Sequence, residues 1–285
     1  MRKADVQSYL RRLGIPDPGP PSTAGLRALH AAHVERVPFE TLEIHLRRPT
    51  TVDPQESIAR ILRGRGGYCF HLNGAFATLL RALGYAVSWH RGGVHSTSQA
   101  PPPGATGNHL CLVVACEGES WFVDVGLGDA LHEPLPLRAA TYRQGPFTYR
   151  LTRSGVEPGG WRFDHDPRGT FIGMDFSLAP AGPGDFIEWH RELSTSPDSG
   201  FVRVVSAIRR DPHGVDALEG CVLSRTDITG RSQRELDNES DWFGALADVF
   251  GLTLDDVTAV ERSVLWTDVY SKHQVWKARR SGQRP

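Results

Sequence analysis

The chain has 285 residues, a length that suits about two or three domains rather than one small core. Its 32 basic and 33 acidic residues leave a formal net charge of −1, which argues against a nucleic-acid partner or an anionic membrane surface. Four cysteines without a C-x-x-C pair, and no apolar run as long as a membrane span, favour a cytoplasmic protein in a reducing compartment.

Residues 1–88 are predicted to form a helical bundle, because apolar residues recur there at helical spacing in successive segments separated by proline or glycine. His30 and His33 share one of these helices, but two histidines at this spacing on a core-edge face are more often structural than metal ligands. Asp53, followed by Pro54 at the first helical position, predicts the start of another helix. We therefore expect a bundle without a bound metal.

The most informative stretch is 65–84. From Leu72 onward its apolar residues fall on one helix face, and Gly84 supplies a left-handed stop. The adjacent glycines at 66–67 favour a turn, so the helix is predicted to begin near Cys69. A thiol at a helix N-terminus meets unpaired N–H groups and partial positive charge, which favour the thiolate. The alternative is a buried structural cysteine, which is the commoner case for a cysteine taken at random.

Beyond the bundle the apolar pattern changes to period two, which predicts an antiparallel sandwich or barrel over 89–188. His109 opens one strand and Asp124 lies in the next, with a predicted hairpin turn at 117–120. Neighbouring backbones would allow a hydrogen bond between the imidazole and the carboxylate. Together with Cys69 these residues supply a nucleophile, a group that exchanges protons and a group that orients it.

Residues 189–285 carry signals of both helices and strands. Within this segment, 201–208 is predicted to be a strand, and Ser240 is predicted to cap a helix that ends at Gly251. The basic segment 277–284 is expected to be a frayed, solvated end. The order of helices, strands and mixed elements predicts an α+β protein.

Several sequence blocks carry a resemblance to a known family. They are residues 37–42 (VPFETL), 65–69 (RGGYC) with Asn73, the strand that holds His109, 123–128 (VDVGLG) with Pro134, 146–151 (PFTYRL), and 194–197 (STSP) with Ser199 and Phe201. The RGG-aromatic-Cys block, with its downstream histidine and DVG, is the specific part. On these blocks the chain resembles the arylamine N-acetyltransferases over nearly its whole length.

The resemblance implies an N-terminal helical bundle (1–88), a central antiparallel β-barrel (89–188) and a C-terminal α/β lid (189–285). The catalytic core would resemble that of cysteine proteases and transglutaminases. The implied reaction is a ping-pong transfer of acetyl from acetyl-CoA, through an acetyl-Cys69 thioester, to an arylamine, arylhydrazine or hydroxyarylamine. Acetyl-CoA would be a co-substrate, and no metal is implied.

The family's catalytic residues fall on Cys69, His109 and Asp124, the three reached from spacing. The resemblance also implies that the acceptor pocket is surrounded by substrate-binding residues at Phe39, Leu127 and Phe201. No glycine-rich phosphate loop or dense basic patch appears, so CoA is expected to bind weakly, at about tens of micromolar or worse.

The chain departs from the family pattern at three positions. His71 replaces the usual glutamate, Leu127 the usual phenylalanine, and Asn108 the usual threonine or serine. The changes at Leu127 and Asn108 bear on which acceptor the protein prefers. On the helix, residue 71 is about 200° around the axis from Cys69, so its ring is not expected to face the thiol.

Three other functions are compatible with parts of this pattern. An amide synthase would use the same triad to release a chain from an acyl-carrier protein onto an aromatic amine, without CoA. A papain-like protease is disfavoured, because its histidine lies much farther from its cysteine than His109 does from Cys69. A non-catalytic binding protein is disfavoured while all three triad residues are present.

Overall fold

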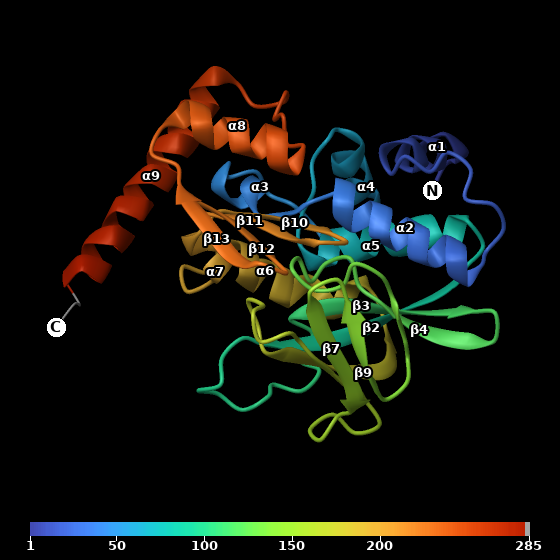
Figure 1. Cartoon of the computed structure of the whole chain (residues 1–285). Coiled ribbons are helices and arrows are strands. Elements are labelled where there is room, and N and C mark those ends of the chain that lie inside the picture. Colours follow the sequence, from blue (N-terminus) through green and yellow to red (C-terminus); the bar gives the residue numbers. More distant parts are fainter. Residues whose placement is uncertain (283–285) are drawn as a thin grey trace.

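The computed structural model describes residues 1–282, with side chains up to Arg279. An N-terminal group of helices lies against a barrel and a separate sheet that carries the C-terminal helices (Figure 1). The N-terminal helices are α1 (Lys3–Arg12), α2 (Thr23–Arg36), α3 (Leu42–His45), α4 (Pro54–Leu62) and α5 (Cys69–Ala82). None of the helices in residues 1–282 combines the length and apolarity needed to cross a membrane.

Local sequence signals explain where these helices begin and end. The Ser22 side chain, rather than that of its neighbour Thr23, caps α2 by accepting from the N–H of Gly25. Asp53 caps α4 as predicted. Helix α5 begins at Cys69 and is followed by Gly84 at φ +94°, which confirms both predicted ends of this helix.

Helix α5 is the centre of the largest apolar core. Eleven of its residues are buried, and they pack against α1, α2 and α4 on one side and strand β3 on the other. His30 and His33 contribute to this core, since the ring of His33 bonds the Tyr9 hydroxyl at 2.9 Å and that of His30 contacts backbone carbonyl oxygens. The buried face holds the first turn of α5 firmly in place.

An eight-stranded antiparallel sheet follows and curls into a nearly closed barrel (Figure 1). Its strand order is β5-β4-β3-β2-β9-β8-β7-β6. The strands are β2 (Ala86–His95), β3 (His109–Cys116), β4 (Glu119–Val123), β5 (Leu135–Pro136), β6 (Ala140–Gln144), β7 (Phe147–Arg153), β8 (Trp161–Asp164) and β9 (Gly173–Ala181). Strands β3 and β4 form the predicted hairpin, with Leu112 opposite Val123 and Cys116 opposite Glu119.

The second sheet has five strands in the order β1-β10-β11-β12-β13. Its strands are β1 (Phe39–Glu40), β10 (Ser206–Asp211), β11 (Gly214–Glu219), β12 (Val222–Asp227) and β13 (Gly230–Glu235). The accompanying helices are η1 (Pro183–Phe186), α6 (Ile187–Thr195), α7 (Gly200–Arg203), α8 (Glu239–Phe250) and α9 (Ala259–Gly282). Because β1 comes from the N-terminal third of the chain, this sheet ties the two ends of the sequence together.

Three C-terminal predictions were wrong in detail. The predicted strand 201–208 is a short helix up to Arg203 and becomes a strand only at Ser206, because the Ser199 side chain caps α7. The helix that ends at Gly251 is capped by Asn238 rather than Ser240. The basic segment continues α9 through 282 instead of fraying; of the predicted frayed end, residues 283–284 lie outside the described chain.

Candidate active site

The turn before α5 requires glycine at both of its central positions. A Cβ on Gly66 would overlap the carbonyl oxygen of Pro38, and a Cβ on Gly67 would lie 2.7 Å from the ring of His71. Gly67 also has φ +157°, a backbone conformation that side-chain-bearing residues rarely adopt. The glycine pair therefore lets the chain pass between β1 and α5 and enter the helix at Cys69.

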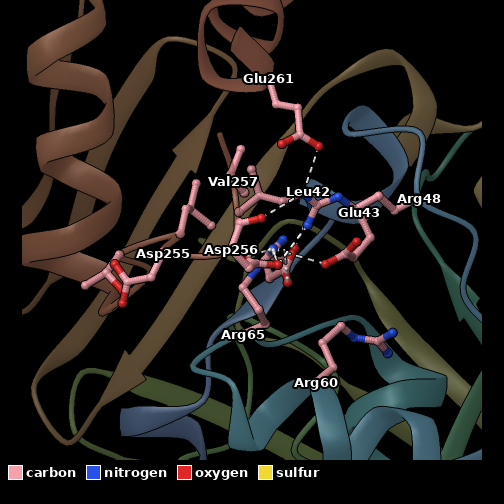
Figure 2. A network of polar contacts seen from close by, with 12 residues as sticks. Leu42, Glu43, Arg48, Arg60, Arg65, Asp255, Asp256, Val257 and Glu261 are labelled. Atoms are coloured by element: carbon pink, nitrogen blue, oxygen red, sulfur yellow. Dashed lines mark hydrogen bonds and ion pairs between the residues drawn. The ribbon is translucent and has the colours of Figure 1, made fainter. Parts of the chain in front are cut away.

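The Arg65 side chain connects this turn to acidic side chains from distant parts of the chain. It is 1% exposed and lies 3.1 Å from a Glu43 carboxylate oxygen and 3.3 Å from Asp256 (Figure 2). It also lies 3.8 Å from Glu40. Glu40 in turn accepts from the N–H of Gly66 at 3.3 Å. A buried guanidinium needs such partners, since an unpaired buried charge costs several kcal/mol. The network ties the turn to both ends of the chain.

Arg48 extends the same network toward the C-terminal helices. It donates to Asp256 at 2.8 Å and to Glu261 at 2.9 Å, as Figure 2 shows. The segment between α8 and α9 is thereby fixed to the loop after α3. These partners are about two hundred positions apart in the chain, so no local pattern predicts their pairing.

The structure brings Cys69, His109 and Asp124 together. Nε2–H of His109 donates to Oδ2 of Asp124 at 2.7 Å, and the two residues are 3% and 1% exposed. The Cys69 side chain is the other hydrogen-bonding neighbour of the His109 ring. Burial lowers the pKa of His109, but the Asp124 carboxylate and the neighbouring Cys69 side chain outweigh it and raise this pKa to about 10. The arrangement favours a protonated imidazole at His109.

Asn73 fixes the carboxylate, a role that the sequence interpretation did not assign. Its side chain is fully buried and donates to Oδ1 of Asp124 at 2.8 Å and to the Leu110 carbonyl at 2.7 Å. Its own oxygen accepts from the N–H of Val125 at 2.9 Å. The sequence signal that could have identified Asn73 is its position one helical turn after Cys69, which puts both side chains on the same face of the helix.

An aromatic cluster lies beside the nucleophile's turn. The ring of Phe201 is 5.9 Å from that of Phe39 and 5.2 Å from that of Tyr68, between centroids. Leu127 is 8% exposed and belongs to the barrel core, against which Phe39 also packs. Of the predicted pocket residues, Phe39 and Phe201 therefore meet directly. Tyr68 is a third member that sequence reasoning missed.

Tyr68 is held in place by a histidine from the C-terminal part of the chain. Its hydroxyl lies 2.7 Å from Nδ1 of His190, and Nε2 of His190 lies 2.6 Å from the Thr50 carbonyl. Since a carbonyl only accepts, Nε2 carries the proton and Nδ1 accepts from the hydroxyl. Burial lowers the pKa of His190, which favours this neutral form.

His71 occupies the first turn of α5 without facing the thiol. Its Nδ1 accepts from the N–H of Tyr68 at 3.3 Å, which is the role of a glutamate in a capping box. Burial, together with the nearby charge of Arg60, lowers the pKa of His71 well below its ordinary value. A neutral imidazole thus replaces the carboxylate as hydrogen-bond acceptor.

We expect His71→Glu to stay folded and active, because a carboxylate can accept the same N–H of Tyr68 and lies near Arg60. His71→Leu removes the acceptor and should lower the free energy of unfolding by about 1 kcal/mol. Thermal melts and steady-state rates of both variants check this expectation. A folded but inactive His71→Glu protein would show that the imidazole itself takes part in the chemistry.

Selective alkylation should distinguish Cys69 from the other thiols. At pH 6 the imidazole of His109 is protonated and attracts the thiolate. Burial raises the pKa of Cys111, Cys116 and Cys221, the last to about 11, so these thiols stay protonated. We expect a brief iodoacetamide treatment at pH 6, followed by peptide mapping, to label Cys69 first. Equal labelling of any other cysteine would contradict the assignment.

Asn73→Ala should lower the free energy of unfolding by about 2–4 kcal/mol, because it leaves the Leu110 carbonyl and the Val125 N–H without buried partners. Urea denaturation checks this value. Thr78→Ala is the matched control in the same helix: its half-buried hydroxyl only donates back to Gly74, and its loss should cost much less. Similar losses in the two variants would show that the amide has no special structural role.

The sequence matches a known protein family over most of its length. The N-acetyltransferase family model matches residues 22–259. The arylamine N-acetyltransferase of Mycolicibacterium smegmatis is 36% identical over 270 residues, covering 89% of this chain and 94% of that protein. The arylamine N-acetyltransferase / N-hydroxyarylamine O-acetyltransferase of Salmonella typhimurium is 39% identical over 153 residues, covering 53% of this chain and about half (54%) of that relative.

The fold as a whole is also similar to solved structures. The arylamine N-acetyltransferase of Mycobacterium marinum, solved in complex with CoA, superposes with a TM-score of 0.83 at 27% identity, covering 93% of this chain and 98% of that one. A proansamycin X synthase from Amycolatopsis mediterranei is 33% identical over 157 residues, covering 53% of this chain and 59% of that protein. The chain belongs to the arylamine N-acetyltransferase family and is an acyltransferase of that class.

Proposed function

We propose that the protein transfers an acetyl group from acetyl-CoA to an arylamine, arylhydrazine or hydroxyarylamine by a ping-pong mechanism through an acetyl-Cys69 thioester. The observation that carries this proposal is the 2.7 Å hydrogen bond from His109 to Asp124, with a cysteine on a helix N-terminus beside the same imidazole. That arrangement supports a thiolate nucleophile with a proton-exchanging partner.

In the first half-reaction the Cys69 thiolate attacks the thioester carbonyl of acetyl-CoA. The N–H groups at the start of α5 stabilise the oxyanion of the tetrahedral intermediate. The carbon–sulfur bond to CoA then breaks, and His109 gives its proton to the departing thiolate. Asp124 holds the imidazole in the tautomer and orientation that this transfer needs.

In the second half-reaction the amine attacks the acetyl-Cys69 carbonyl. The neutral imidazole of His109 accepts the proton that the amine loses, and the carbon–sulfur bond to Cys69 breaks. The products are the acetylated amine and the original thiolate–imidazolium pair. Protons and charges therefore balance over one cycle.

The acceptor is proposed to lie against Phe39, Tyr68 and Phe201. Their rings meet at distances suited to packing a further flat ring. Leu127, where the family usually has phenylalanine, leaves a smaller and non-aromatic side chain on the barrel side of this pocket. An aromatic acceptor broader than a single ring is therefore compatible with the site.

The donor is proposed to enter between the barrel and the C-terminal α/β unit, which acts as a lid on a protease-like and transglutaminase-like core. We infer domains at 1–88, 89–188 and 189–285, joined by the pairing of β1 with β10. The relative solved with CoA supports CoA as the leaving group. Four unpaired cysteines within residues 1–282 support a cytoplasmic location.

An amide synthase is the second candidate. The similarity to a proansamycin X synthase favours it, since the same triad can release an acyl chain from a carrier protein onto an aromatic amine. This candidate needs no CoA and makes an acyl-carrier protein the partner. The two functions share the covalent step at Cys69 and differ in the donor.

Initial-rate kinetics separates the two candidates. With acetyl-CoA and 4-methoxyaniline both varied, the proposal predicts turnover and parallel double-reciprocal plots. Intersecting plots would contradict a covalent intermediate. Turnover with a pantetheine-bound acyl chain on a carrier protein, but none with acetyl-CoA, would establish the amide synthase instead.

A further inference from the structure

A groove of about 1060 Å³ lies between α9 and the five-stranded sheet. Its walls come from α7, strands β11 to β13 and the C-terminal half of α9, the red helix that extends away from the body in Figure 1. None of the residues that line it is a member of the Cys69, His109 and Asp124 set. The groove is thus a second concave site, of a size typical for a small ligand.

The groove gathers apolar side chains that the fold leaves exposed. Val204, Val275 and Trp276 all line it and are 43%, 52% and 44% exposed. Val205 and Val269, each 3% exposed, form part of its floor. Exposed apolar side chains that converge in a hollow indicate a ligand surface rather than scattered surface residues.

The side chains that line the groove carry more positive than negative charge, although Lys272 is paired with Asp268 at 2.8 Å and His273 with Glu235 at 3.0 Å. Arg203 and Arg279 line it and make no ion pair with the side chains of residues 1–279, whereas Arg231 lies 3.7 Å from Glu219. Glu219 contributes the one carboxylate among the lining residues of this part of the chain. Two cations beside an apolar hollow are complementary to an anionic group on an apolar body.

We propose that this groove is a binding site for a small apolar anion, an aromatic or aliphatic body that carries a carboxylate, sulfonate or phosphate. The body packs on Val204, Val275 and Trp276, and the anionic group lies between Arg203 and Arg279. Binding here does not require Cys69.

One contact connects the groove with the aromatic cluster at the active site. The His45 side chain lines the groove, and its Nε2–H donates to the Phe201 carbonyl at 3.0 Å. The Phe201 ring packs on Tyr68 and Phe39 and does not line the groove. A bound anion therefore lies next to α7, the helix that carries Phe201, and should change KM for the amine. This effect on KM rests on the proposed function.

The test is a fluorescence titration of the full chain with 8-anilinonaphthalene-1-sulfonate, an apolar anion. We expect saturable binding that weakens about tenfold or more in Arg203→Glu and in Arg279→Glu, because each reverses a charge beside the sulfonate. Arg234→Glu is the matched control, since Arg234 is exposed on β13 beside Gln233 but does not line the groove. Trp276→Ala, which removes apolar area without adding charge, should also weaken binding.

Cys69→Ala should bind the probe as wild type does, which separates failure of this proposal from failure of the proposed reaction. Equal affinity in wild type, in Arg203→Glu and in Trp276→Ala would overturn the site. Competitive displacement of the probe by CoA would also overturn it, by making the groove part of the donor site. Circular dichroism and thermal melts verify that each variant is folded.

Discussion

Asp124→Asn should lower kcat/KM about 10⁴-fold while the protein stays folded. Oδ1 of Asp124 accepts from Asn73 and from the N–H of Gly126, at 2.8 and 2.9 Å. An amide at this position must keep its oxygen on these two donors, so its NH2 group faces Nε2 of His109. Nε2 would then have to accept, which places the imidazole proton on Nδ1 and removes the imidazolium.

The measurement is steady-state kinetics with acetyl-CoA and an arylamine, beside thermal melts. Asp175→Asn is a suitable control, because Asp175 is 1% exposed and bonded to Arg162 at 2.7 Å in the barrel. It should cost stability and leave the chemical step nearly unchanged. Activity of Asp124→Asn within about tenfold of wild type would be incompatible with the proposed role of the carboxylate.

Gly126→Ala should lower kcat about 10²-fold, because a displacement of about 1 Å at reacting groups has that cost. A Cβ at this position would lie 2.6 Å from Cα of Cys69 and 2.8 Å from Nδ2 of Asn73. Both neighbours belong to the buried first turns of α5, so relief of the overlap must shift either the nucleophile's backbone or the loop after Asp124. Overpacking of this kind also costs about 1–3 kcal/mol of stability.

Gly244→Ala provides the control for that substitution. Gly244 lies within α8, and a Cβ added to it would meet no neighbouring atom within 4 Å, so alanine should be neutral or stabilise the helix by up to about 1 kcal/mol. The catalytic rate and the melting temperature should therefore fall in Gly126→Ala but not in Gly244→Ala. Wild-type kinetics in Gly126→Ala would mean that the loop after Asp124 is free to move away from Cys69.

The parts of the site that the sequence predicts are those built by local rules. The glycine pair at 66–67 and the apolar spacing after it locate the start of α5. The hairpin signal places His109 at the start of β3, and Asp124, predicted to lie within the next strand, directly follows β4. Each of these inferences depends on backbone preferences within a few residues. Cys69 lies near His109 and Asp124 because the buried face of α5 packs on β3.

The parts that escape prediction depend on contacts between distant segments. Asn73 binds a carboxylate 51 positions away, and Tyr68 binds His190 across 122 positions. The apolar run that begins at Phe201 has the composition of a strand, but the Ser199 cap and the contact of the Phe201 carbonyl with His45 favour one helical turn first. In such segments, contacts with distant residues override the local preference for a strand.

Peptide mapping by mass spectrometry after a single turnover tests the central claim, the acetyl-Cys69 intermediate, most directly. Protein mixed with stoichiometric acetyl-CoA should gain the mass of one acetyl group, located on the peptide that carries Cys69, and should lose it when an arylamine is added. The Cys69→Ala variant should gain nothing. An acetyl group on another residue, or one on Cys69 that the arylamine does not remove, would contradict the account.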